Sequence, residues 1–581
     1  MVTDLTTKKL DMKNKSNIFN KGTLLLLCLI FTMFNACNKD DNESFEKTRL
    51  FRPVLNEDLY AEGNTIYVNM GNLKNAVGYV VEVSRDTFKT IDYTIVSDTS
   101  FVVIDENTAG EELFWNMLYQ VRATALEADA EYNSKISDLG NVRTEVFPSI
   151  LNAPAKFDVT DIAARVTWAT VNDGAPITGI KVFAASDLKL NTPLFDEVSV
   201  SSAEDDAGEG FVYGLTPETE YQIAIYSGTE IRGWVNYTTR EPDISPTAPG
   251  VIDIRADESP SAVENAVISA PDGAIILVKR GVTYNLPSSS NALNKSITIR
   301  AAYGFGEQKA KLFTTGNWNI ASGSDIDHIR FIDLEIRGED YGGDYVFNPS
   351  SGNTNVKELL FDNCVIGTLR GIVRFRGTNA TLSNYEIRNS VVDSIGNYGL
   401  FTGDTNAGTP ATATVENVKF INSTFNKIQV GIANRNNSKS IVIDGCTFAN
   451  FPLAGNAGYK IFRYRGGDGN NNVTDGIVIS NTIFGHGWDQ TGTATEYPVT
   501  GTEGLPNTAF DVSNTYTVTD MSWFTDANGE PVNTIPNLVL GNAGNTQNGL
   551  FADPENNDFN IKDSGFTGKF TAGDPRWRVK I

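Results

Sequence analysis

The chain is a succession of short segments in which apolar and polar residues alternate, which is the period of a β-strand. Glycine, asparagine and aspartate separate the segments of the first module. Strands of this length and spacing predict a small β-sandwich over residues 52–146. Its expected strands are Thr65–Val68, Gly78–Ser84, Tyr93–Ser97, Phe101–Ile104 and Tyr119–Ala125.

A second sandwich is expected over residues 147–241. Ala164–Trp168 reads as a strand with a core tryptophan, and a turn with the pattern Leu-x-Pro-x-Thr-x-Tyr ends at Tyr221. This segment resembles a fibronectin type III domain, and the first module resembles it through its strand Tyr119–Ala123. In that architecture Trp168 and Tyr221 belong to the core rather than to a ligand site. Prolines in residues 242–250 then mark a linker.

Beyond the linker a motif of alternating apolar residues recurs, with Asn, Asp or Gly at its fifth position. These fifth positions lie 30, 26, 33, 23 and 36 residues apart. A repeat of this length, built of short strands, predicts a right-handed parallel β-helix over residues 251–509. Ala274–Lys279 and Ser296–Ala301 are expected to begin the coil. The repeats are Ile329–Ile336, Leu359–Ile366, Tyr385–Val392, Val418–Phe425, Ile441–Phe448 and Ile477–Phe484.

The repeat register makes two further predictions. The asparagines at the fifth position should form an internal ladder at one corner, with their amides bonded along the stack. Cys364 and Cys446 occupy equivalent positions three turns apart. At about 4.8 Å per strand they would lie roughly 14 Å from one another, which excludes a disulfide between them.

The N-terminus predicts an exported lipoprotein. Lysines lead into the apolar run Gly22–Phe34, which is too short to span a bilayer that needs about 20 residues. The run ends at Ala36-Cys37 and resembles a bacterial lipobox, which implies a signal peptide at 1–36 and a lipid anchor on Cys37. The acidic tether at 37–51 resembles the tag that exports Bacteroidetes lipoproteins to the cell surface; a periplasm-facing lipoprotein is the alternative. Translation could start at Met1 or Met12.

Residues 510–581 change in character and end in LFADPENNDFNIKDSGFTGKFTAGDPRW. This ending resembles the C-terminal domain of unknown function of Bacteroidetes outer-membrane lipoproteins that carry fibronectin-like modules and a pectate-lyase-like β-helix. Here it would complete or cap the coil. Such proteins are associated with polysaccharide utilisation, and many of them act on pectin or other uronate-containing glycans. The resemblance therefore implies that this protein handles a glycan, with other surface proteins of the same system as partners.

Composition narrows the chemistry. With 47 basic and 71 acidic residues the net charge is −24, which would repel a phosphate backbone and excludes nucleic acid as the expected partner. The chain has two histidines, His328 and His486. A metal site with several histidine ligands, or a catalytic triad of serine, histidine and aspartate, is therefore not expected.

A strip of basic residues is the candidate site. Aligning the second strand of two repeats pairs Gly371–Gly377 with Tyr459–Gly466, and strand alternation then points their arginines out of the coil. Guanidinium groups bind carboxylates through paired hydrogen bonds, so the strip predicts binding of an acidic, uronate-containing polysaccharide. The alternative is that acidic neighbours such as Asp404 and Asp468 pair with the arginines. The strip comprises Arg374, Arg376, Arg435, Lys460, Arg463 and Arg465.

Two enzymatic alternatives use the same fold. β-Elimination of a uronate needs its carboxylate neutralised and a base such as Lys460, Tyr398 or Tyr464. The Arg-x-x-Pro-x-x-Arg pattern of calcium pectate lyases is absent, and no calcium cage is fixed, so Ca²⁺ stays an open alternative as cofactor. The acidic residues dense enough for a cage are Asp333, Glu335, Glu339, Asp340 and Asp344.

Hydrolysis is disfavoured. Gly485-His486-Gly487 resembles a polygalacturonase motif, but the paired Asp-Asp that those enzymes need is absent from the coil. His486 is therefore expected to be a turn residue. Aromatic residues in predicted loops could stack on sugars, with Trp488 the first to test. The others are Trp318, Tyr341, Tyr345, Tyr398 and Tyr497.

The sequence thus predicts an all-β chain in which sandwich modules precede a β-helix. Binding of an acidic polysaccharide at the cell surface is the first hypothesis. A polysaccharide lyase acting by β-elimination is the second, and a non-catalytic adhesion or structural protein is the third.

Overall fold

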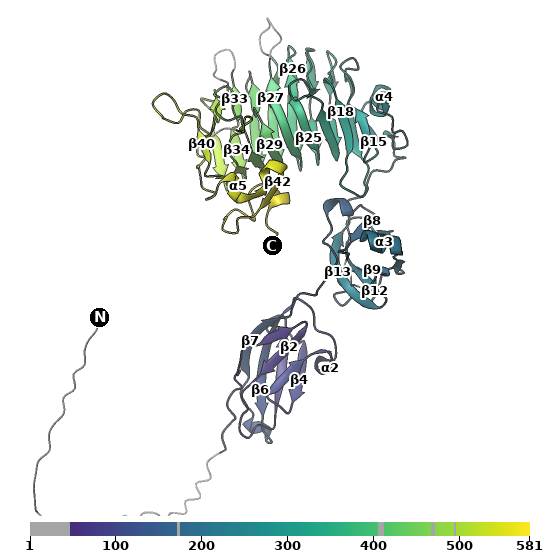
Figure 1. The fold of residues 1–581 in the computed structure, drawn as a ribbon, viewed down its shortest axis with the longest axis vertical. Helices are drawn as coiled ribbons and strands as arrows, with labels where there is room; N and C mark the ends of the chain where they lie inside the picture. Colours follow the sequence, from purple (N-terminus) through teal and green to yellow (C-terminus); the bar gives the residue numbers. More distant parts are fainter. Residues whose placement is uncertain (1–46, 171–174, 405–411, 466–470, 493–495, 581) are drawn as a thin grey trace, which may run out of the picture. The chain divides into compact units, whose positions relative to one another are not determined.

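The computed structural model describes residues 47–170, 175–404, 412–465, 471–492 and 496–580. The protein is all-β, with two β-sandwich modules followed by a parallel β-helix (Figure 1). It divides into two compact units, residues 1–148 and 149–581. The predicted signal peptide and Cys37 lie outside the described residues. Among the described residues, no helix is long and apolar enough to cross a membrane.

The first unit is the predicted sandwich, and all five expected strands are present. Two strands are additional, β1 and β7, and α2 (Glu106–Ala109) follows β5. Tyr119 is fully buried and its hydroxyl accepts a hydrogen bond from the Phe114 amide at 2.9 Å, which fixes the corner before β6. One sheet contains β1 (Tyr60–Glu62), β2 (Thr65–Asn69) and β5 (Phe101–Ile104); the other contains β4 (Tyr93–Ser97), β3 (Gly78–Ser84), β6 (Leu118–Leu126) and β7 (Ser137–Arg143).

The second unit begins with the second sandwich, which again consists of antiparallel sheets and a buried tyrosine whose hydroxyl accepts from a backbone amide five residues earlier. Trp168 and Tyr221 are buried in its core, as predicted, and the Tyr221 hydroxyl accepts from the Thr216 amide at 2.9 Å. One sheet contains β10 (Val198–Ser199), β9 (Gly179–Ala184), β12 (Glu220–Ser227) and β13 (Glu230–Thr238); β11 (Glu209–Tyr213) pairs with β8 (Ala163–Thr167), and α3 (Ser202–Ala207) precedes β11.

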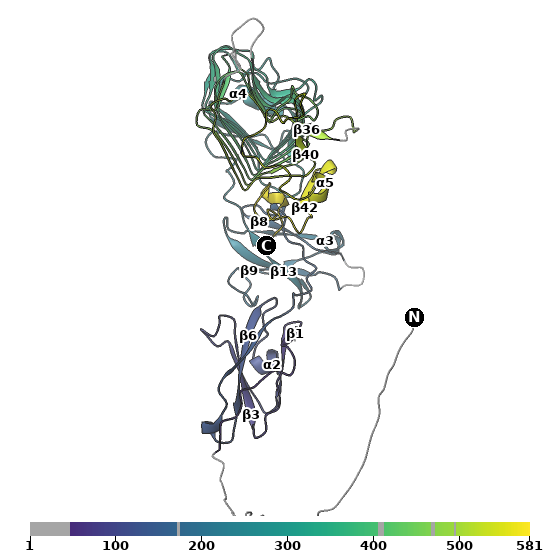
Figure 2. The same cartoon turned by 90° about the vertical axis from the view of Figure 1, so that its left-hand side faces the viewer.

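The coil is a stack of parallel strands, and Figure 2 views its turns nearly end on. Each predicted repeat contributes one strand before its fifth position and one after it, on two different faces. The strands before it form the first face: β14 (Val251–Asp253), β15 (Ala274–Val278), β17 (Ile297–Ala301), β20 (Ile329–Ile332), β24 (Leu359–Asp362), β26 (Ala380–Arg388), β28 (Thr414–Ile421), β31 (Ser440–Asp444), β34 (Ile477–Ser480) and β38 (Phe510–Ser513), with β19 (Asp325–Ile326) and β23 (Thr354–Val356) at its margin.

The strands after the fifth position form the second face. The ladder of both faces runs past residue 509, because β38 and β39 pair with β34 and β35 as a further turn. The second face contains β16 (Thr283–Asn285), β18 (Ala310–Thr314), β21 (Leu334–Gly338), β25 (Val365–Phe375), β27 (Val391–Gly403), β29 (Thr424–Ile428), β32 (Thr447–Ala449), β35 (Ile483–Phe484) and β39 (Tyr516–Thr517).

A third face begins where β25 and β27 turn a corner within one strand. Val365 to Leu369 pairs on the second face, whereas Gly371 to Phe375 pairs with the third. This face carries the basic strip. Its strands are β22 (Tyr345–Phe347), the second halves of β25 and β27, β30 (Ile432–Asn434), β33 (Phe462–Tyr464) and β37 (Thr502–Glu503).

The fifth position of each repeat is the corner between the first and second faces. All six residues there have a left-handed backbone, with φ between 48° and 63°, which Asn, Asp and Gly adopt at least cost. Their amides bond to the neighbouring turn, as from Asn363 Nδ2 to Asp333 Oδ1 at 2.8 Å and from Asn389 Nδ2 to Asp362 Oδ1 at 2.9 Å. The prediction of an internal ladder is wrong in one respect: the asparagine side chains lie half-buried on the outside, since a left-handed residue turns its side chain away from the core.

The interior position next to this corner holds small residues. Cys364 and Cys446 are buried there as free thiols, which confirms that they form no disulfide. The Cys364 amide donates to Ser390 Oγ at 3.0 Å, so each small side chain serves the backbone of the adjacent turn. Burial raises the pKa of the Cys364 thiol to about 12.

The ends of the coil are covered. Helix α4 (Ala262–Ser269) packs four apolar side chains onto the first turns. After β36 (Tyr497–Val499) and β40 (Met521–Trp523), the chain folds back along the coil through α5 (Gln547–Leu550), β41 (Phe551–Asp553) and β42 (Asp558–Ile561). Buried Thr424 on β29 donates to Asp574 at 2.8 Å and accepts from Trp577 Nε1 at 2.7 Å, which fastens this C-terminal segment.

Candidate anion-binding strip

The third face places five of the six basic residues of the predicted strip, the arginines, in two outward columns, whereas Lys460 precedes β33 and belongs to neither. Arg374 and Arg463 belong to the first column, separated by Thr402 and Ala433, which are small. The second column lies two residues further along each strand and runs Arg376, Asp404, Arg435, Arg465. The residues between the columns point inward, and Phe375 and Tyr464 are fully buried, so alternation places the arginines outside as predicted.

Two carboxylates neutralise part of this strip. Asp404 accepts from Arg374 at 2.7 Å and from Arg435 Nε at 2.9 Å, and Glu503 accepts from Arg463 Nε at 2.8 Å. The sequence also allowed that acidic neighbours such as Asp404 pair with the arginines, and this is the case for Arg374 and Arg435. Asp468, the other predicted partner, lies outside the described residues. Four of the six basic side chains in the strip therefore form an ion pair with an acidic one: Arg374, Arg435 and Arg463 at 2.9 Å or less, and Lys460 at 3.5 Å.

The expectation of a freely exposed strip is wrong for the paired residues. The side chains of Arg374 and Arg463 are 15% and 20% exposed, since each lies down on the sheet toward its carboxylate. Lys460 is buried at 8%; its ammonium group donates to the Ala457 carbonyl and lies 3.5 Å from Glu503.

Arg376 and Arg465 differ from the others. Neither guanidinium makes a hydrogen bond or ion pair with another described residue, and both side chains are half-buried. The Nε atoms of Arg376 and Arg374 are buried without a partner among the described residues. Donors held out of water without an acceptor are costly, so this part of the strip is suited to receive an anion.

Two groups of the strip, Lys460 and Arg465, have a lowered pKa, and the positive charge around them contributes to it. Burial lowers the pKa of Lys460, with Arg463 and Arg465 acting in the same direction and Glu503 against it. Burial also lowers the pKa of Arg465, assisted by the charges of Arg463 and Arg435. Burial is thus the main reason that the charged forms of Lys460 and Arg465 are disfavoured, with the neighbouring arginines adding to it and the carboxylates opposing it.

Tyr398 extends the strip at the side of β27. The Arg374 guanidinium lies 3.9 Å from the centre of its ring and that of Arg370 lies 4.8 Å from it. Arg370, whose Nε donates to Asn397 Oδ1 at 3.0 Å, was missed by the sequence argument. It stands four residues before Arg374 on the same long strand, and only the corner within β25 brings both to one tyrosine.

Several other predicted site residues do not join the strip. Trp318 is fully buried and stacks on Phe347, so it belongs to the core and not to a loop. Tyr345 is 3% exposed on β22, and its ring lies edge-on to Tyr398 with ring centres 5.8 Å apart, so it packs beside the strip without offering an open face to a sugar. Trp488 is half-buried, bridged to Leu453, and Tyr341 is 42% exposed. Tyr464 points inward and bonds to Ser438 at 2.8 Å, which removes it as a base. His486 is buried against Tyr497, with ring centres 4.0 Å apart.

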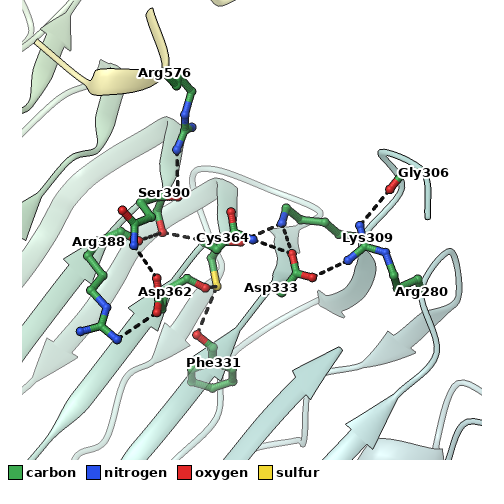
Figure 3. A network of polar contacts seen from close by, with 12 residues as sticks. Arg280, Gly306, Lys309, Phe331, Asp333, Asp362, Cys364, Arg388, Ser390 and Arg576 are labelled. Carbon is green, nitrogen blue, oxygen red and sulfur yellow. Dashed lines mark hydrogen bonds and ion pairs between the residues drawn. The ribbon is translucent and has the colours of Figure 1, made fainter. Parts of the chain in front are cut away.

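The acidic residues proposed for a calcium cage are engaged elsewhere. Asp333 is held by Arg280 and Lys309, as Figure 3 shows, and Asn363 donates to it as well. Asp344 accepts from the backbone amides of Glu339 and Asp340, both at 2.8 Å. Among the described residues, no group of three or more acidic, histidine or cysteine side chains converges as a metal site.

The network around Asp333 is a second polar cluster, and its charged groups pair with one another to stabilise the fold. Figure 3 follows it from Arg280 through Asp333 to Asp362, Arg388 and Arg576. Arg388 pairs with Asp362 at 2.9 Å, and Arg576 of the C-terminal segment donates to the Asn389 carbonyl at 2.8 Å. Each charged group has a protein partner, so the cluster ties the corner to the returning chain.

Two segments of the coil match protein families without an assigned function. Residues 282–428 match a domain of unknown function, DUF4957, and residues 441–577 match another, DUF5123. The second match includes both the last turns of the coil and the returning C-terminal segment. No curated protein matches the chain.

Solved structures similar to this chain are arrays of fibronectin type III domains. Domains FN1–FN3 of chicken CNTN1 share 15% identity over 33% of this chain and 66% of theirs, with a TM-score of 0.15. A two-domain segment of chicken tenascin shares 14% over 32% of this chain and 99% of its own, with a TM-score of 0.14. The central array of RIM-binding protein shares 12% over 33% and 61%, with a TM-score of 0.12. This chain thus spans just under two thirds of the CNTN1 fragment.

Proposed function

We propose that this protein is a cell-surface lipoprotein that binds an acidic, uronate-containing polysaccharide through the basic strip of its β-helix. Cys37 would carry the lipid anchor, the sandwich modules would act as spacers, and other surface proteins of polysaccharide utilisation would be its partners. The anchor and the location rest on the sequence resemblance.

The observation that carries the binding proposal is that the guanidinium groups of Arg376 and Arg465 have no hydrogen-bond or ion-pair partner among the described residues. In a chain of net charge −24, six basic side chains gather on one face with Asp404 and Glu503 as their acidic contacts. A carboxylate ligand would supply the acceptors that these donors lack, and charge-assisted hydrogen bonds contribute about 1.5–3 kcal/mol each. A neutral polymer offers no such gain.

Elimination is the second candidate, and Lys460 is the observation that favours it. A lysine with a lowered pKa beside Arg463 has the character of a base that removes a proton next to a neutralised carboxylate. Its burial and its bond to the Ala457 carbonyl turn the ammonium group away from the surface. Binding without cleavage is therefore the function that the geometry supports better.

The test is affinity electrophoresis through polygalacturonate, with a neutral galactan gel as reference. The double variant Arg376→Gln/Arg465→Gln should lose retention by about tenfold or more, since two charged contacts disappear. Arg330→Gln is the matched control: Arg330 is 40% exposed, pairs with Glu358 and lies on the first face, so retention should not change.

Unchanged retention of the double variant would contradict the proposal. The same mixtures report on elimination, because unsaturated uronate products absorb in the ultraviolet. A rise in absorbance that Lys460→Met abolishes would establish a lyase in place of a binding protein.

A further inference from the structure

The two unpartnered arginines stand at a fixed separation along the coil. Arg376 extends the β25 turn, Asp404 the β27 turn, Arg435 the β30 turn and Arg465 the β33 turn, all in one column. Three strand spacings of about 4.8 Å separate the ends of this column, or roughly 14 Å. The spacing is rigid because it is set by the backbone ladder.

The positions between them are already satisfied. Asp404 and Arg435 pair with each other at 2.9 Å, and Asp404 also binds Arg374. A carboxylate placed over Asp404 would be repelled, and one placed over Arg435 would compete with an existing ion pair. The column therefore alternates between open cationic ends and a neutralised middle.

A hexopyranose advances an extended polysaccharide by a length close to one strand spacing. A uronate chain that runs along the column would thus bring one sugar to each turn of the coil. If the first carboxylate meets Arg376, the fourth meets Arg465, and the second and third lie over the Asp404–Arg435 pair.

We infer that the strip recognises a pair of carboxylates three sugar residues apart, so that a tetrasaccharide with a uronate at its first and fourth positions is the shortest ligand that engages both ends. This inference rests on the proposed function and names its ligand more closely. The second uronate, which faces Asp404, needs no charge, so a methyl ester there is tolerated.

Isothermal titration with α-1,4-linked oligogalacturonates of two to six residues tests the inference. Affinity should rise by about tenfold or more between the trisaccharide and the tetrasaccharide, and by little with each further residue. The step should vanish in both Arg376→Gln and Arg465→Gln, which should bind the tetrasaccharide no better than the trisaccharide. Arg330→Gln should retain the step.

The outcomes separate the two proposals. An even gain with every added sugar, or a step that survives either substitution, would overturn the spacing and leave polymer binding intact. Failure of every oligomer and of polygalacturonate to bind would overturn the proposed function and this inference with it. Both arginines lack protein partners among the described residues, so the midpoint of thermal unfolding should stay unchanged and exclude misfolding as the cause.

Discussion

At the scale of single residues, the corner asparagines join backbone conformation to side-chain chemistry. Asn389 has φ of 52°, its amide donates to Asp362, and its carbonyl accepts from Arg576. Residues with a Cβ pay about 1–2 kcal/mol in this conformation unless a short polar side chain bonds locally. Gly445 takes the equivalent place in another turn, where a Cβ would lie 2.4 Å from Asn422 Oδ1.

This corner predicts a ranked effect of substitution. Asn389→Ala should lower the free energy of unfolding of the coil by about 1–3 kcal/mol, because it adds left-handed strain to a lost hydrogen bond. Asn389→Gly should cost less, since glycine adopts positive φ freely. Urea unfolding followed by circular dichroism measures both. An alanine variant as stable as the glycine variant would contradict the role of the backbone conformation.

At the scale of elements, the returning C-terminal segment depends on a few buried polar contacts with the second face. Asp574 is 2% exposed and bonds to Thr424 and, through its amide, to Thr447. Burial raises the pKa of the Asp574 carboxyl, opposed by Arg576. Because its folded pKa exceeds the unfolded one, this group favours folding below the unfolded pKa, and that contribution is lost as pH rises through the folded pKa.

Thr424→Val should release this segment. The substitution preserves shape but leaves Trp577 Nε1 without its acceptor and Asp574 Oδ2 without the Thr424 hydroxyl as donor, a cost of about 1–3 kcal/mol for each group. We expect faster proteolytic loss of residues beyond α5, measured by mass spectrometry. Thr298→Val on the first face, where the threonine is 5% exposed, is the control with little expected change. Equal cleavage of both variants would show that Thr424 does not fasten the segment.

At the scale of the whole molecule, the basic strip is a local exception on an acidic protein. A net charge of −24 disfavours the approach of polyanions in general, so under the proposed function an acidic polysaccharide would be directed to this basic face. The proposed lipid anchor would hold that face at the cell surface, where long polymers arrive before import.

The anchor has its own test. Cys37→Ser should move the protein from the membrane fraction to the soluble fraction and abolish incorporation of labelled palmitate in the bacterial host. Cys364→Ser is the matched control, because that thiol is buried in the coil and serine occupies the equivalent position at Ser390. A Cys37 variant that still sediments with membranes and takes up label would contradict the lipoprotein assignment.

Sequence patterns alone predict the order of the modules, the strands of the first sandwich, the repeats of the coil and the separation of Cys364 from Cys446. These are consequences of alternation and of a repeat along the chain, which are local properties. The same register placed Asn, Asp and Gly at one corner of the coil, but it predicted an internal ladder there, and the left-handed backbone that turns these side chains outward came from the structure.

Which arginines of the strip lack a partner within the described part of the chain could be learned from the three-dimensional structure and not from the sequence. Asp404 lies 30 residues from Arg374, and Glu503 lies 40 residues from Arg463, so these partners meet because the turns stack with loops of unequal length between them. Burial of Trp318 and Tyr345 was likewise fixed by the third face, and Thr424 meets Trp577 across 153 positions. A sequence pattern places a side chain on a face, but charge pairing depends on distances between turns that the pattern does not contain.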